Sequence, residues 1–409
     1  MRRLVSLTAS ACLIASVSAC SAREDDAAAG ADGCSPGITD TSVHLGSSVS
    51  MSGAAAAVGA IAEAGSAYFD QINADGGVTM GDGTTRTIDF EVLDDAYDPA
   101  RTVSNVRRLV EQEDVFALHS VTGTGPVLAV TDYAKAQGVP LVFPVSGSDQ
   151  FGEVVADGVP LAGVSQPDIS WEADLWVRHA VESDPDATFA ILSANDGYGN
   201  AGAEGAKAAI EELGADLVAE QDYEQSAANV DSQVAQLKDS GATVLLSITS
   251  ASFQTQALAR AADIGWYPTT YIPATGSDVN IVAPAGADAT KDLYSLAWLR
   301  DVSDDADTSE GMTDWREFAD ANGLDDKSFL AAIGYTNAQF LVKALEAMPG
   351  CTRDDLLEAV RGAEDFTPAL GMPGVTFEGV ADYPNIITGL ALVKFDGEHW
   401  DATGDVYQQ

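Results

Sequence analysis

The sequence predicts an α/β protein with two units, each a parallel sheet flanked by helices. From Ser42 onward, strand-like runs alternate with helical stretches of the length that connects parallel strands. The chain has 409 residues, which is enough for two domains of ordinary size. Hydrophobic residues make up 46% of it, so each unit can bury a core.

The strands and helices follow one another regularly over the first two thirds of the chain. The strand-like runs are residues 43–49, 87–93, 115–119, 140–145, 188–192, 243–248 and 270–273. The Ala-rich helical stretches between them are residues 56–74, 99–113, 126–137, 171–183, 199–213, 230–240 and 253–264. Local signals agree, because Asp98 is a good cap before Pro99, and Gly138 and Gly214 end helices before strands.

The rhythm changes after residue 298. Helices are expected at residues 308–321, 328–348 and 354–361, the last begun by Thr352 as a cap with acids in the first turn. Short strands are expected at residues 374–377 and 390–395.

The first twenty residues form an export signal. Two arginines precede an apolar stretch, residues 4–17, that is too short to span a bilayer and leads through small residues to Cys20. This ending resembles the lipobox of bacterial lipoproteins, whose cysteine becomes the lipidated N-terminus. We therefore expect residues 1–19 to be a signal peptide and residues 20–37 a tether, with Cys20 lipidated at the outer face of the cell membrane. The alternative is an ordinary cleaved signal with an incidental cysteine.

Composition narrows the possible partners. The chain carries 63 acidic and 20 basic residues, a net charge of −43 at pH 7. Such a charge disfavours nucleic acid and anionic lipid surfaces, and we interpret it as a solubility feature. No later stretch has the ~18 continuous apolar residues of a membrane helix, so the chain is not itself a channel or permease.

Cysteine and histidine usage predicts one disulfide and no metal site. Once Cys20 and the cysteine of the signal are set aside, Cys34 and Cys351 remain in an oxidising compartment, where an even pair usually forms a disulfide. Two free buried thiols are the alternative. The four histidines lack metal-ligand spacing among themselves or with the cysteines, so we expect no metal and no cofactor.

The segments that follow the predicted strands are rich in Gly, Ser and Thr. They are residues 50–53, 122–125, 146–148, 193–198, 250–252 and 275–277. Parallel sheets bind ligands beyond the carboxyl ends of their strands, and short hydroxyls at helix N-termini suit an anion or carboxylate. Each segment alone would be explained by turns and helix caps. All of them on one edge favour a cleft.

The order of several motifs resembles the leucine/isoleucine/valine-binding family of type I periplasmic binding proteins, the substrate receptors of ABC importers. The motifs are LGSSVSMSG from Leu45, INADGGV from Ile72, DDAYDP from Asp94, GVPLV with PVS from Gly138, and NDGYG from Asn195. The resemblance implies two lobes joined by three crossovers that close on a small ligand, and a monomer. Lobe 1 would comprise residues 38–163 plus about 300–380, and lobe 2 residues 164–299 plus about 381–409.

The resemblance also implies the ligand-binding residues. Thr124 stands where the family holds the ligand carboxylate, the next loop offers backbone groups, and Tyr198 packs over the ligand from lobe 2. This sequence departs from the family pattern around the ligand amine. Thr275 stands where amino-acid binders carry an acid that pairs with the amine. Family tyrosines are also replaced near Val58 and Ser250. The full candidate set is Ser52, Thr124, Ser146, Gly147, Ser148, Tyr198, Ser250 and Thr275.

We therefore expect an exported solute-binding lipoprotein that delivers a small ligand to an ABC permease. The ligand is a branched-chain or other amino acid, with Asp196 or Asp278 replacing the missing acid, or an aromatic or aliphatic carboxylate, or a neutral polar molecule. A ligand-binding component of a sensory system is the alternative function. An enzyme is not supported, because the sequence has no G-x-S-x-G elbow, Walker loop or G-x-G-x-x-G after a strand.

Overall fold

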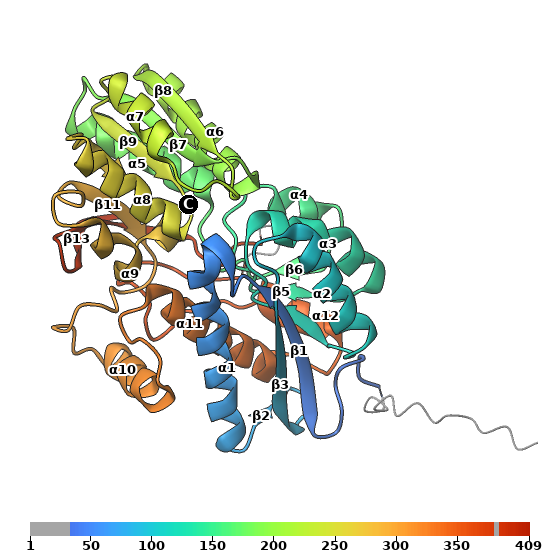
Figure 1. The fold of residues 1–409 in the computed structure, drawn as a ribbon. Helices are drawn as coiled ribbons and strands as arrows, with labels where there is room; N and C mark the ends of the chain where they lie inside the picture. Colours follow the sequence, from blue (N-terminus) through green and yellow to red (C-terminus); the bar gives the residue numbers. More distant parts are fainter. Residues whose placement is uncertain (1–32, 380–383) are drawn as a thin grey trace, which may run out of the picture.

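The computed structural model describes residues 33–379 and 384–409, which form two α/β lobes (Figure 1). The sheet of lobe 1 has the order β2-β3-β1-β4-β5-β6. Its strands are β1 (Ser42–Val49), β2 (Val78–Thr79), β3 (Thr85–Asp94), β4 (Ala117–His119), β5 (Leu141–Val142) and β6 (Leu161–Ala162). All neighbours are parallel except β2, which pairs antiparallel with β3 at the edge.

The helices of lobe 1 come from two distant parts of the chain. The first part provides η1 (Gly53–Val58), α1 (Gly59–Ala74), α2 (Pro99–Glu111), α3 (Thr124–Gln137) and α4 (Phe151–Ala156). The second provides α10 (Glu310–Asn322), α11 (Phe329–Ala347) and α12 (Arg353–Arg361). Helices α1 and α11 lie side by side (Figure 1). A Cβ on Gly334 of α11 would lie 2.0 Å from the Ile61 carbonyl oxygen, so only glycine allows this approach.

Lobe 2 has a larger sheet with the order β13-β12-β11-β10-β9-β7-β8. Its strands are β7 (Thr188–Ala194), β8 (Asp216–Tyr223), β9 (Val244–Ile248), β10 (Thr269–Tyr271), β11 (Leu293–Ala297), β12 (Gly389–Phe395) and β13 (Trp400–Gln408). Its helices are α5 (Ile169–Ser183), α6 (Gly197–Leu213), α7 (Asp231–Asp239), α8 (Ala251–Asp263), η2 (Ala274–Gly276), α9 (Val279–Val282) and η3 (Ala283–Ala285). Strand β12 pairs antiparallel with both β11 and β13, whereas all other neighbouring strands of this sheet are parallel.

The described chain passes between the lobes after β6, after β11 and again before β12. The first and third passages pair through Val164 and Asn385, and the Asn385 amide donates to the Gln166 carbonyl oxygen at 2.7 Å. The strand that we expected at residues 374–377 does not form, because only Phe377 makes a bridge, to Ile387. The residue limits that we gave for the lobes stay predictions.

A disulfide joins Cys34 to Cys351 and ties the start of the fold to the segment before α12. Backbone and side-chain bonds reinforce this tie: Ser35 N–H donates to the Cys351 carbonyl oxygen at 3.1 Å, and Arg353 N–H donates to Ser35 Oγ at 3.0 Å. The predicted signal peptide and Cys20 lie outside the described residues. Within the described residues, no helix has both the length and the apolar character to cross a bilayer.

Candidate ligand-binding site

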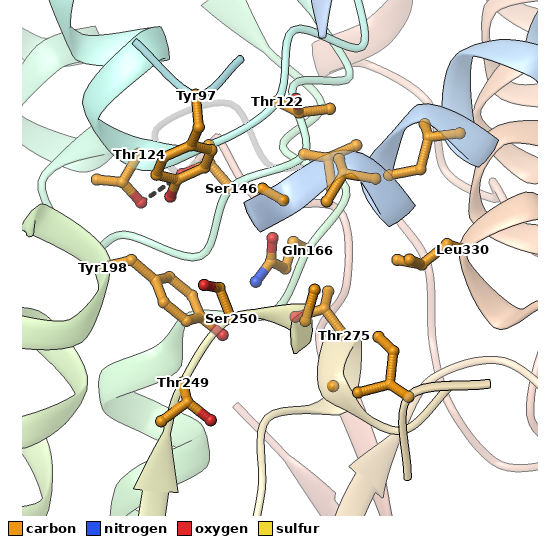
Figure 2. A pocket seen from close by; sticks show the side chains of 18 residues that line it. Tyr97, Thr122, Thr124, Ser146, Gln166, Tyr198, Thr249, Ser250, Thr275 and Leu330 are labelled. Atoms are coloured by element: carbon orange, nitrogen blue, oxygen red, sulfur yellow. Dashed lines mark hydrogen bonds between the residues drawn. The ribbon is translucent and has the colours of Figure 1, made fainter. Parts of the chain in front are cut away.

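A cavity of about 90 Å³ lies between the two lobes and is lined by residues of both (Figure 2). Lobe 1 contributes η1, the start of α1, the turn after β3, the start of α3 and the loop after β5. Lobe 2 contributes the start of α6, the loop after β9 and the short helix η2. Most of these segments follow strands, which is where a sheet of this type presents its binding residues.

A pair of buried hydroxyls stands at one end of the cavity. Thr124 is the first residue of α3, and its Oγ1 lies 2.7 Å from Ser146 Oγ on the neighbouring loop. The Gly123 N–H donates to the Val145 carbonyl oxygen at 2.9 Å, which holds the two loops together. The N–H groups of the first turn of a helix have no intrahelical acceptor and attract negative charge. This end therefore suits a carboxylate.

Two tyrosines from opposite lobes border the same end of the cavity (Figure 2). Tyr97 follows β3 with a positive φ of 62°, and its N–H donates to Asp95 Oδ1 at 2.9 Å. A Cβ on Gly123 would lie 2.6 Å from Tyr97 Cε2, so the tyrosine ring covers the start of α3. Burial raises the pKa of both Tyr97 and Tyr198 well above the usual value, so both phenols are neutral.

The opposite end of the cavity is apolar. Val58 and Ile61 come from lobe 1, Ile281 comes from lobe 2, and Leu330 comes from the start of α11. Figure 2 shows Leu330 on the far side of the cavity from Thr124 and Tyr198. Among the described residues that line the cavity there is no Asp, Glu, Lys, Arg or His. The site is therefore amphipathic and has no ionic partner for a ligand ammonium.

Comparison with known proteins places the chain in a family. The profile of the family described as "Periplasmic binding protein" matches residues 42–396. The chain belongs to this family. Its members are solute-binding proteins, not enzymes, and act outside the cytoplasm.

Relatives and solved structures agree with this assignment. The "Leu/Ile/Val-binding protein homolog 7" of Brucella suis biovar 1 (strain 1330) is 23% identical over 78% of this chain and 80% of its own length. The structure of a fatty acid ABC transporter substrate-binding protein from Thermomonospora curvata superposes with a TM-score of 0.77, at 20% identity over 93% of this chain and 96% of that one. A branched chain amino acid ABC transporter from Thermus thermophilus with bound valine gives a TM-score of 0.79, at 16% identity over 90% and 96%.

The structure brings five of the residues predicted for this binding protein to the cavity. They are Thr124, Ser146, Tyr198, Ser250 and Thr275. Sequence reasoning missed Tyr97, Gln166 and Leu330, which also line it. Tyr97 belongs to the DDAYDP motif, in which we assigned a role only to Asp98, as a helix cap. Gln166 lies in the passage between the lobes, where nothing in the sequence signals a binding role.

Three other predicted residues of the binding protein do not line the cavity. Ser52 is exposed, and its Oγ donates to Asp94 Oδ2 at 2.6 Å. Gly147 faces the Pro167 carbonyl oxygen, which a Cβ would approach to 2.3 Å, and its own carbonyl accepts from the Ile169 N–H. Ser148 Oγ accepts from the Gln150 N–H at 3.3 Å. These residues shape the loops around the site.

The acids that we considered as replacements for a family carboxylate are occupied. Asp196 caps α6 by accepting from the N–H groups of Tyr198 and Gly199, and its other oxygen accepts from the Gln225 amide. Asp278 is buried and accepts from Ser328 Oγ at 2.8 Å and from the Leu330 N–H at 3.1 Å. Neither acid lines the cavity.

Proposed function

We propose that this protein is the substrate-binding component of an ABC importer and captures a small monocarboxylate that has an apolar tail and no α-amino group. The observation that carries the proposal is the amphipathic cavity. It has hydroxyls and a helix N-terminus at one end and apolar side chains at the other, and no ionisable side chain other than tyrosine among its described lining residues.

The hydroxyl end supports a carboxylate. Thr124 and Ser146 are both almost fully buried, and Thr122 Oγ1 is buried without a hydrogen-bond partner among the described residues. A carboxylate oxygen would accept from such hydroxyls and from free N–H groups at the start of α3. The apolar end, with Val58, Ile61 and Leu330, would bury an alkyl tail at about 25 cal/mol per Å².

The lack of an acidic lining residue supports a ligand without an amine. A buried ammonium that has no carboxylate partner is costly to desolvate. The family resemblance places Thr275 where amino-acid binders carry an acid, and Thr275 provides only a hydroxyl. An amino acid would therefore leave its ammonium uncompensated in this cavity.

A matched six-carbon series tests the ligand class. Protein that begins after Cys20 is titrated by calorimetry with hexanoate, norleucine, hexylamine and 1-hexanol, which differ only in their polar groups. We expect hexanoate to bind more tightly than the other three. Norleucine binding at least as tightly as hexanoate would show that an acid reaches the amine and would refute the amine-free assignment.

The N-terminus supports anchoring of the mature protein. We propose that Cys20 is lipidated and that the protein works as a monomer, handing its ligand to a membrane permease. Membrane fractionation tests the anchor: wild-type protein should sediment with membranes, whereas the Cys20→Ala variant should not. Equal release of both proteins into the soluble fraction would exclude the anchor.

A further inference from the structure

A second polar group lies directly behind the lobe 2 wall of the cavity. Glu172, in the first turn of α5, is fully buried. Its Oε2 accepts from the Ala274 N–H at 2.8 Å, so it holds the short helix η2 that presents Thr275 and Gly276 to the cavity. Its Oε1 is buried and has no hydrogen-bond partner among the described residues.

Other unpartnered polar atoms surround the same short helix. The Tyr198 hydroxyl is buried, and Thr275 lies close to it but outside hydrogen-bond geometry. Gln254 Nε2 is also buried without a partner, and the Gln254 side chain lies against Gly276. Buried polar atoms in natural proteins are rarely left unpaired, so several together next to a binding cavity indicate a functional polar network.

We propose that Glu172 is a positioning and specificity-determining residue, whose carboxyl must be uncharged for the cavity to accept a carboxylate ligand. This inference rests on the proposed ligand class. Glu172 acts through η2, because its hydrogen bond to Ala274 sets the backbone that carries Thr275. When ionised, it would place a negative charge immediately behind the wall that the ligand contacts.

The surroundings of Glu172 keep it uncharged at neutral pH. The pKa of Glu172 is raised to about 8, because burial and the negative charge of Asp168 at the start of the same helix raise it by more than the Ala274 N–H lowers it. On α6, Tyr198 is neutral, and the Asp196 carboxylate accepts hydrogen bonds from the N–H groups of the first turn. After η2, the Asp278 carboxylate accepts hydrogen bonds from the Ser328 hydroxyl and the Leu330 N–H. Among these described neighbours, no cation faces Glu172.

The sign of the resulting pH dependence follows from these charges. Hexanoate stays ionised from about pH 6 to about pH 9, whereas Glu172 loses its proton across this range. For an assumed separation of about 10 Å and an effective dielectric constant of about 20, the repulsion between the two negative charges would weaken hexanoate binding by about tenfold. The affinity of a carboxylate ligand should therefore fall as the pH rises through about 8.

The test compares three proteins, each beginning after Cys20: wild type, Glu172→Gln and Glu182→Gln. Glutamine keeps the hydrogen bond to Ala274 without the ability to ionise, and Glu182 is an exposed acid on the same helix. Hexanoate affinity is measured by calorimetry at several values between about pH 6 and about pH 9. The affinity for uncharged 1-hexanol is measured alongside.

We expect hexanoate affinity to fall with pH in wild type and in Glu182→Gln, and to stay constant in Glu172→Gln at the low-pH wild-type value. Any 1-hexanol affinity should not change with pH. Hexanoate binding without a pH slope in wild type, or with an unchanged slope in Glu172→Gln, would overturn this inference alone. No hexanoate binding by any variant at any pH would overturn the proposed function and this inference with it.

Thermal unfolding without ligand tests the ionisation of Glu172 separately from ligand binding. A carboxyl whose folded pKa lies above its unfolded value destabilises the fold as the pH rises from about 4.5 to about 8. The Tm difference between Glu172→Gln and wild type should therefore grow in favour of the variant across this range. A constant difference would overturn the inference, because Glu172 would then not titrate there.

Discussion

The hydroxyl of Thr124 should contribute most of the specificity for a carboxylate. In the Thr124→Val variant the side chain keeps its shape but loses the hydroxyl, and Ser146 Oγ loses its partner at 2.7 Å. Hydrogen bonds to charged groups contribute about 1.5–3 kcal/mol, so hexanoate affinity should fall by about 10–150-fold. Affinity for 1-hexanol, which carries no charge, should change far less.

Calorimetry with hexanoate and 1-hexanol measures this effect, and Thr131→Val is the matched control. Thr131 lies on the same helix, but its Oγ1 donates to the Leu128 carbonyl oxygen and it does not line the cavity. The control should bind hexanoate like wild type. If folded Thr124→Val retained wild-type affinity for hexanoate, the carboxylate would not bind at the start of α3 and our argument would be refuted.

Further predictions concern the site, the closure of the lobes and the stability of the fold. Tyr198→Ala should weaken hexanoate binding at least tenfold by calorimetry, and unchanged affinity would count against the site. A Cβ on Gly197 would lie 3.0 Å from Thr124 Cγ2 across the cleft, so Gly197→Val should weaken binding while its circular dichroism spectrum stays native. Burial lowers the pKa of His119 from 6.5 to about 3, so stability should fall by about 2 kcal/mol between about pH 7 and about pH 5. Urea unfolding of His119→Gln should show a smaller fall, and an equal fall would assign it to other groups. The double substitution Cys34→Ser with Cys351→Ser removes the disulfide, which closes a loop with a sequence separation of 317. The free energy of unfolding measured in urea should fall by up to about 5 kcal/mol. An unchanged urea midpoint would contradict this prediction.

The alternation of strands and helices could be predicted because its signals are local. Asp98 caps α2 and Thr352 caps α12 with a full capping box, as their sequence contexts indicate. Strands β2, β6, β8, β11 and β13 were not predicted. Of these, β8 and β13 are edge strands whose exposed residues dilute the hydrophobic signal. Their pairing comes from the neighbouring strand, which local sequence does not reveal.

Part of the candidate site could be predicted from the order of strands and helices. Thr124, Ser146 and Tyr198 follow strands, so topology alone places them near one edge of each sheet. Leu330 reaches the cavity only because α11 packs against α1, a contact between segments far apart in the sequence. Glu172 resembles an ordinary acid in the first turn of a helix, and only tertiary burial distinguishes it.

Contacts between the lobes beside the cavity bear on how a ligand would favour their closure. At the rim, Ser252 Oγ donates to the Ala54 carbonyl oxygen at 3.2 Å in an exposed contact between α8 and η1. Such a bond contributes only about 1 kcal/mol. The buried bonds of Asp278 to Ser328 and Leu330 lie where α9 meets the start of α11. A ligand that contacts Thr124 from one lobe and Tyr198 from the other gains both sets of contacts only when the lobes are closed. The difference in its affinity for the two forms, more than the rim contact, should therefore set the closed population.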